Sequence, residues 1–275
     1  MESGVHPKVK PLLEAVYAEQ RSQEWLTLRE NMLTASDAAS ALGYGAPQKL
    51  YVQSWPYLGL SDTSTASEWV TDSAAGMTAI VTGEKTHNGV LSQKADSVRG
   101  KKDGTPAKTI LEYAEERGLS TGVLTNVNIA DATPAACYAH VDERGKFGEI
   151  FAQLFAPRFG DGADVVMGVG RAEIWANAKA NGRDLDAIAT RPVYRSLAEI
   201  PAGEARPIVA ADRDFDIHDA ALLALDKLRT NPKGYFLMIE WDAHTDDPER
   251  GLNNVVGFDK LIREIAGRVD LNDTL

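Results

Sequence analysis

The sequence contains a single cysteine, Cys137, among its 275 residues, and this excludes a disulfide within the chain. Long apolar runs are also missing. No stretch approaches the roughly 20 residues of a membrane-spanning helix, so no membrane segment is expected. Residues 1–10 are polar and lack the apolar centre of a signal peptide, so none is expected there. No internal repeat and no low-complexity tract is visible.

Basic residues are in the minority. The 29 lysines and arginines face 40 aspartates and glutamates, which gives a net charge of −11. This balance argues against broad nucleic-acid binding, because neutralising phosphates needs a basic surface. It suits a metal-binding enzyme rich in carboxylates. The hydrophobic share of 44% and the charged share of 25% are ordinary for a globular protein. The length allows one α/β domain, or a domain with an appendage.

Short apolar runs alternate with helical patterns along most of the chain. Strands are expected at residues 121–127, 164–168, 207–210 and 235–239. Helices are expected at residues 74–81, from 107 to 118, after Pro134, at 149–155, from Arg171, around 221–228 and around 255–269. Residues 84–105 are polar with glycines and predict a surface loop. The alternation predicts an α/β fold with a mostly parallel sheet and helices on both of its faces.

The first 47 residues differ from the rest and predict an N-terminal helical segment, followed by an α/β domain at 48–275. Apolar residues recur at helical spacing over residues 8–31, and residues 34–42 predict a second helix. Residues 20–25 and 34–43 resemble the opening of λ-exonuclease-like viral recombinase nucleases. This resemblance raises the alternative of a DNA exonuclease or recombinase fragment. It implies an acidic metal motif with a lysine, and no match to that motif is found.

Residues 70–79 hold the strongest candidate for a chemical group. The short run 69–71 is a candidate strand that leads into Asp72, Ser73 and small helix-forming residues, with Gly83 at the expected helix end. A hydroxyl at a helix N-terminus lies among unpaired N–H groups with partial positive charge. Such a position favours an attacking alkoxide or a phosphate. The alternative is that Ser73 is an ordinary helix cap. In parallel sheets chemistry gathers at the carboxyl ends of strands. Asp72, residues 126–133 and Glu240 all follow candidate strands.

The longer string favours the chemical interpretation. The run Asp-Ser-Ala-Ala-Gly-Met-Thr-Ala at residues 72–79, with residues 82–89 after it, resembles the nucleophile region of alkaline phosphatases. Residues 55–65 resemble the segment that leads into it. In that family the serine forms a phosphoserine intermediate on a site of two zinc ions and one magnesium ion. The resemblance implies that Ser73 is the nucleophile, next to Asp72 in the catalytic site.

A second block of resemblance runs from Lys108 to Arg144. In alkaline phosphatases the matching threonine ligates magnesium, the residue two positions earlier tunes that site, and the arginine binds the substrate phosphate. The resemblance assigns these roles to Thr133, Asp131 and Arg144. The chemistry agrees, since Mg²⁺ takes hard oxygen ligands and a guanidinium holds two phosphoryl oxygens. Taken singly, Asp131 would be a helix cap and Arg144 a solvated surface charge.

A third block follows the apolar strand 235–239. The family presents a magnesium-binding glutamate there, which implies Glu240 as a metal ligand. An aspartate and a histidine usually follow as zinc ligands, and Asp242 and His244 are the candidates. Their spacing is tighter than the commoner family pattern, so Asp246 or Asp247 could replace one of them. The histidines at 6, 87, 140 and 218 lack such neighbours and are expected to be structural.

Family members also carry a Gly-Asp-Gly motif before the serine, and an Ala-Asp-His motif and a further histidine after the last helix. No Gly-Asp-Gly precedes Ser73 in this sequence, and neither the Ala-Asp-His motif nor a further histidine follows the last expected helix. We therefore expect a hydrolase of phosphate monoesters, with Zn and Mg as cofactors, whose turnover is weak or absent as this chain. The alternative is a non-catalytic remnant that binds phosphate or metal. The expected partners are small phosphate monoesters and, for the protein itself, a second copy in a homodimer. No nucleic-acid partner is expected.

Overall fold

The computed structural model describes residues 50–55, 59, 61–213 and 216–274. The chain divides into two compact units, Met1–Trp55 and Pro56–Leu275. In the first unit the described part is the short 3-10 helix η2 (Tyr51–Ser54). The two helices expected at residues 8–31 and 34–42, and the nuclease-like residues 20–45, lie outside the described residues. The domain boundary at 47/48 stays a prediction.

The second unit contains a five-stranded sheet in which every pairing is parallel. The strands are β1 (Ser120–Asn128), β2 (Val165–Val169), β3 (Val193–Tyr194), β4 (Ile208–Ala211) and β5 (Tyr235–Glu240). Their order across the sheet is β3-β4-β2-β1-β5. The predicted α/β fold with a parallel sheet is confirmed. The strand missed in the sequence is β3, which has only two residues and so leaves no apolar run to recognise.

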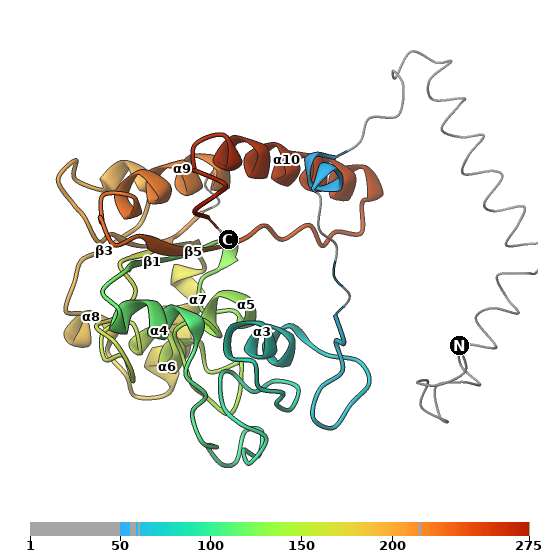
Figure 1. The fold of residues 1–275 in the computed structure, drawn as a ribbon. Coiled ribbons are helices and arrows are strands. Elements are labelled where there is room, and N and C mark those ends of the chain that lie inside the picture. The colour runs from blue at the N-terminus through green and yellow to red at the C-terminus, as the bar shows by residue number, and fades with distance from the viewer. Residues whose placement is uncertain (1–49, 56–58, 60, 214–215, 275) are drawn as a thin grey trace, which may run out of the picture. The chain divides into compact units, whose positions relative to one another are not determined.

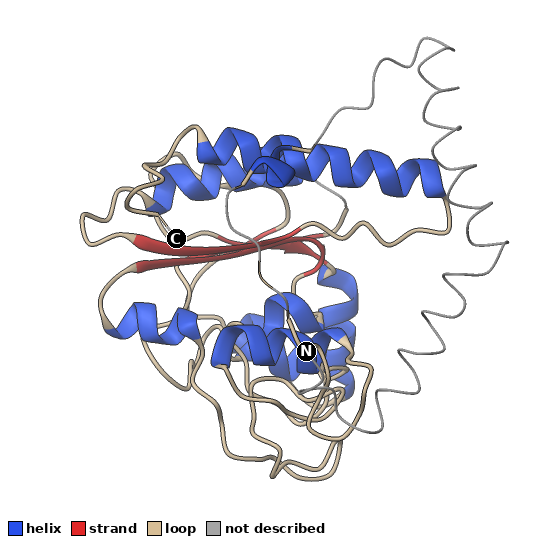
Figure 2. Ribbon diagram, turned by 45° about the vertical axis from the view of Figure 1, so that its right-hand side comes forward, coloured by secondary structure: helices blue, strands red, loops and turns tan. Residues whose placement is uncertain are grey.

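Helices cover both faces of this sheet (Figures 1 and 2). One face carries α9 (Ile217–Leu228) and α10 (Pro248–Ala266). The other carries α3 (Ser73–Thr82), α4 (Ile110–Glu116), α5 (Ala132–Ala135), α6 (Phe147–Ala152), α7 (Arg171–Ala180) and α8 (Leu185–Ile188). A further 3-10 helix, η3, spans Leu197–Glu199. Among the described residues no helix has both the length and the apolar character needed to cross a membrane.

Neighbouring strand residues alternate between two hydrophobic cores. On β1, Val123 belongs to the core shared with α3 to α8, whereas Leu124 belongs to the core shared with α9 and α10. Strand β2 alternates in the same way. Successive side chains of a strand point to opposite faces, so a sheet covered on both sides needs apolar residues at every position. This requirement explains why the inner strands read as continuous apolar runs.

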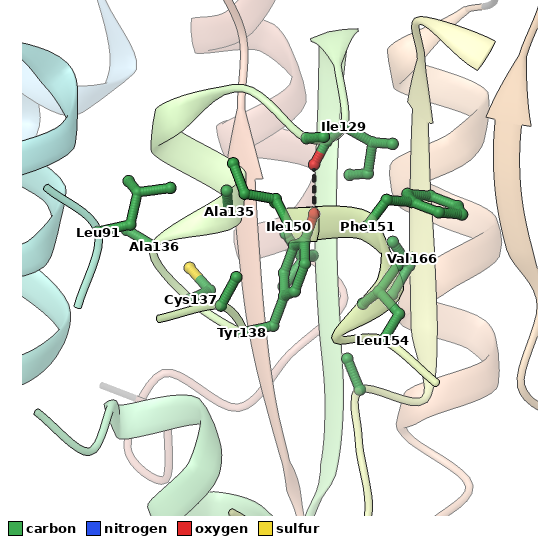
Figure 3. Packing of buried hydrophobic residues seen from close by; sticks show 14 of the residues in the cluster. Leu91, Ile129, Ala135, Ala136, Cys137, Tyr138, Ile150, Phe151, Leu154 and Val166 are labelled. Carbon is green, nitrogen blue, oxygen red and sulfur yellow. Dashed lines mark hydrogen bonds between the residues drawn. The ribbon is translucent and has the colours of Figure 1, made fainter. Parts of the chain in front are cut away.

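The larger core holds the chain that follows β1 against the sheet. Figure 3 shows Tyr138 among Ile150, Phe151 and Val166, with its hydroxyl directed back toward Ile129. That hydroxyl donates a hydrogen bond of 2.7 Å to the Ile129 carbonyl. Buried tyrosine hydroxyls need such a partner. The contact fixes the segment that carries the candidate metal ligands relative to the end of β1.

Two local expectations are wrong. Residues 69–71 form a bend and coil and not a strand, so Asp72 does not follow a strand end. Residues 84–105 are not a simple surface loop, because Leu91 and Ser92 are fully buried and Leu91 forms an antiparallel bridge with Val141. Polar composition suggested exposure, yet Ser92 is buried with its hydroxyl paired: it donates to the Ala136 carbonyl at 2.5 Å.

Candidate active site

Ser73 is the first residue of α3, and the local sequence explains why the helix begins there. Asp72 is the N-cap in an extended conformation, and its carboxylate accepts a hydrogen bond of 3.0 Å from the Ala75 N–H. Gly83 ends the helix in the left-handed conformation that glycine tolerates. The small residues Ala74 and Ala75 are buried, whereas Ser73 is exposed. The serine hydroxyl therefore lies at an accessible helix N-terminus.

Asp72 is held in place by residues 88–89, which end the run 82–89 that resembles the nucleophile region but for which the sequence predicted no contact with Asp72. Its N–H donates to the Asn88 side-chain oxygen at 2.9 Å, and its second carboxylate oxygen accepts from the Gly89 N–H at 2.9 Å. Gly89 also accepts a hydrogen bond from the Arg144 N–H at its carbonyl, at 2.8 Å. Residues 88–89 thus set the distance between the start of α3 and Arg144.

Arg144 joins three of the predicted residues. One guanidinium nitrogen donates to the Ser73 hydroxyl at 2.9 Å and to the Asp72 carboxylate at 3.2 Å. The other terminal nitrogen donates to Asp131 at 2.8 Å. Partial burial lowers the pKa of Arg144, but the hydrogen bonds and charges of Asp131 and Asp72 outweigh this effect and raise it. The arginine is therefore a fixed cation beside the serine hydroxyl.

Glu240, the last residue of β5, lies beside the residues of the second block. Its carboxylate accepts a hydrogen bond of 2.7 Å from the Thr125 hydroxyl. Burial raises the pKa of Glu240, the hydroxyls of Thr125 and Thr133 lower it, and the charges of Asp131 and Asp242 raise it again. Thr133 therefore lies within hydrogen-bonding reach of Glu240, and Asp131 and Asp242 lie near enough for their charges to act on its carboxylate.

The candidate zinc ligands form a looser group. The His244 ring nitrogen Nδ1 lies 2.5 Å from a carboxylate oxygen of Asp242, but the His244 side chain is 99% exposed. Asp247 caps α10 by accepting from the Glu249 N–H at 3.0 Å, and Asp246 is exposed. The structure therefore places Asp242 and His244 together and gives Asp247 a structural role.

The donor set fits magnesium better than zinc. Asp131, Thr133 and Glu240 offer hard oxygen atoms. Burial first, and then the charges of Asp131 and Asp242, raise the pKa of Glu240, and a bound cation would favour its charged form. A catalytic zinc site ordinarily has three protein ligands. Asp242 and His244 supply two, and no cluster of three histidine, cysteine, aspartate or glutamate side chains suited to a metal occurs within the described part of the chain. The described residues do not complete a zinc site.

The chain is similar to known phosphatases over most of its length. It is 27% identical over 215 residues to alkaline phosphatase 4 of Bacillus subtilis (strain 168), which covers 70% of this chain and 45% of that protein. It spans about half the length of the curated relatives that match most of it.

Solved structures agree. The alkaline phosphatase of Thermus thermophilus superposes with a TM-score of 0.70 at 25% identity, over 88% of this chain and 54% of that one. A mutant of the TAB5 alkaline phosphatase, described with Mg bound in its M3 site, gives a TM-score of 0.66 at 25% identity, over 85% of this chain and 69% of that one. The family model "Alkaline phosphatase" matches residues 36–199, more than half of the sequence. The chain therefore belongs to the alkaline phosphatase family.

Proposed function

We propose that this protein is a phosphate monoester hydrolase of the alkaline phosphatase type, with Ser73 as the nucleophile. The observation that carries the proposal is the position of the Arg144 guanidinium, which donates to the Ser73 hydroxyl at 2.9 Å and is anchored by Asp72 and Asp131. An anchored arginine can hold two phosphoryl oxygens while the serine oxygen faces the phosphorus atom.

The residues divide the work as follows. Arg144 and the N–H groups at the start of α3 bind the phosphate dianion. The Ser73 hydroxyl gives its proton to water as its oxygen attacks phosphorus, the bond from phosphorus to the leaving oxygen breaks, and the leaving oxygen takes up a proton from water. Water then attacks the phosphoserine, which releases inorganic phosphate and restores the serine hydroxyl. Asp72 does not contact the substrate in this scheme: it caps α3 and holds Arg144.

Asp131, Thr133 and Glu240 are the residues that would hold magnesium. A divalent cation at such a site supplies positive charge to a developing oxyanion and lowers the pKa of a bound hydroxyl or water. In this chain Glu240 is kept in place by β5, and Asp131 and Thr133 lie at the N-cap and within α5. The ligands therefore come from regular elements rather than from mobile tips.

We further propose that turnover by this chain alone is weak. Asp242 and His244 would provide two of the three protein ligands that a catalytic zinc needs, and no group of three occurs among the described residues. Metal activation lowers the pKa of an oxygen nucleophile by several units, and each unit corresponds to about 1.4 kcal/mol. The remaining assistance comes from Arg144 and the α3 N-terminus, which favour the serine alkoxide without removing its proton.

The test is hydrolysis of p-nitrophenyl phosphate with Mg²⁺ and Zn²⁺, together with mass spectrometry of acid-quenched protein. We expect slow turnover and a phosphate group on Ser73, both abolished in Ser73→Ala. Ser67→Ala, an exposed serine in the preceding segment, serves as the matched control. Turnover at family-like rates would contradict the weak-activity proposal. Unchanged turnover in Ser73→Ala would refute the serine mechanism, and phosphate binding without turnover or phosphoserine would identify a non-catalytic binding protein.

The physiological substrates are proposed to be small phosphate monoesters. The homodimer stays a prediction, which light scattering of the purified chain would check.

A further inference from the structure

We propose that Thr125 and Asn126, the sixth and seventh residues of β1, act as a positioning pair that aims the Glu240 carboxylate at the cation. This inference rests on the proposed magnesium-binding role of Glu240. From the sequence Thr125 was not identified as part of the site, and Asn126 was identified only as the start of the run 126–133 that follows a candidate strand. Both lie on β1, next to the end of β5.

Thr125 controls the orientation of the carboxylate. It is paired in register with Glu240 in the parallel ladder, so the two side chains leave neighbouring strands at the same level. The Thr125 hydroxyl donates to Glu240 Oε2 at 2.7 Å and accepts from the Val127 N–H at 3.1 Å. Since Thr125 is fully buried, solvent does not compete for its single proton. One oxygen of Glu240 is thereby fixed from the protein side.

Asn126 controls the backbone that follows Glu240. Its side-chain oxygen accepts from the Asp242 N–H at 2.7 Å, and its side-chain nitrogen donates to the Asp242 carbonyl at 3.2 Å. These two bonds continue the pairing of β1 with β5 two residues beyond the end of the strand. The backbone is consequently held at Glu240 by the ladder and two residues later, at Asp242, by Asn126.

The same strand provides a control for a merely structural role. Thr121 is also fully buried, lies four residues before Thr125, and donates its hydroxyl to a buried glutamate, Glu115, at 3.1 Å. Removing the hydroxyl of Thr121 or of Thr125 therefore breaks the same kind of bond. Only Thr125 contacts a proposed metal ligand. Groups that orient metal ligands typically change metal affinity by about 10- to 100-fold when mutated.

The experiment measures Mg²⁺ binding by calorimetry and Mn²⁺ binding by electron paramagnetic resonance, with thermal unfolding of each variant. Thr125→Val is expected to lower cation affinity by about 10- to 100-fold, and Thr125→Ser to restore it to near the wild-type value. Thr121→Val is expected to lose stability but keep wild-type affinity. If Thr125→Val does not fold, Asn126→Ala gives the second test, and it too should bind the cation more weakly.

Wild-type affinity in both Thr125→Val and Asn126→Ala would overturn the positioning role. An equal loss of affinity in Thr121→Val would overturn it as well, since the effect would then follow from lost stability. The proposed function fails in a distinguishable way: the wild-type chain would then show no saturable cation binding, or the same binding as Glu240→Gln. Such a result would mean that Glu240 does not bind the cation at all, whereas the outcomes above concern only how Glu240 is positioned.

Discussion

Replacing Glu115 by glutamine is expected to remove a pH-dependent destabilisation of the fold. Glu115 lies in α4 and is only 7% exposed. Its carboxylate accepts hydrogen bonds from the Thr121 hydroxyl at 3.1 Å and from the Gly162 N–H at 3.0 Å. Burial nevertheless dominates and raises the pKa of Glu115 from 4.5 to about 7, because the two hydrogen bonds only partly offset the loss of water around the charge.

The sign and size of the effect follow from this shift. A folded-state pKa above the unfolded value means that the folded protein binds the proton more tightly. The contribution of Glu115 to the free energy of unfolding is therefore greatest below pH 4.5. It falls as the pH rises from 4.5 to 7, and it is constant above that range. One pKa unit corresponds to about 1.4 kcal/mol, so the full loss is about 3 kcal/mol, of which about 2.5 kcal/mol falls between pH 5 and pH 8.

The assay is urea unfolding of wild type and Glu115→Gln at pH 5 and pH 8. Glutamine stays neutral, so the stability of Glu115→Gln relative to wild type should increase by about 2–3 kcal/mol between the two pH values. Comparing the two pH values cancels any constant change in hydrogen bonding. Glu116→Gln, which removes an adjacent carboxylate with an exposed side chain, is the control and should not show this increase. A pH-independent difference between wild type and Glu115→Gln would refute the reasoning.

Three further predictions follow from the site and its support. Arg144→Ala should weaken inorganic phosphate binding in calorimetry by roughly 10- to 100-fold, because hydrogen bonds to charged groups contribute about 1.5–3 kcal/mol; unchanged binding would remove the arginine from the phosphate site. Asp72→Ala should lower the free energy of unfolding by about 1–2 kcal/mol through loss of the α3 cap, and Asp72→Asn by less, as measured in urea. Gly148→Ala should cost about 1–3 kcal/mol, because a Cβ there would lie 2.4 Å from the Ala178 Cα. Gly203→Ala, where a Cβ meets nothing within 4 Å, is its control and should unfold like wild type.

Most of the sheet could be predicted because its strands are apolar on both faces. The runs at 121–127 and 235–239 match β1 and β5 to within one residue at each end. The start of α10 was missed although Asp247 followed by Pro248 is a local start signal: the aspartate caps the helix and proline is tolerated in its first turn. The bend at residues 69–71 was misread, because a short apolar run carries no information about whether another strand lies beside it.

The candidate site was predicted in its members but not in its connections. Resemblance to a family proposed Ser73, Arg144 and Glu240, yet nothing local indicated that residues 88–89 hold Asp72 or that Thr125 holds Glu240. The latter contact joins residues 115 positions apart. Such a pair depends on which strands are neighbours, and a sequence pattern does not encode strand order.

By itself the sequence determined the elements whose signals are local: a helix that starts at a capping aspartate and ends at a glycine, and strands built from unbroken apolar runs. Only the tertiary structure decided that one guanidinium lies between the serine hydroxyl at 73 and the carboxylate at 131. The physical reason is that capping and periodicity act within a few residues. Contacts between distant side chains depend on the order of the strands in the sheet and on how the loops pack. Both follow from the minimum of the free energy of the whole chain.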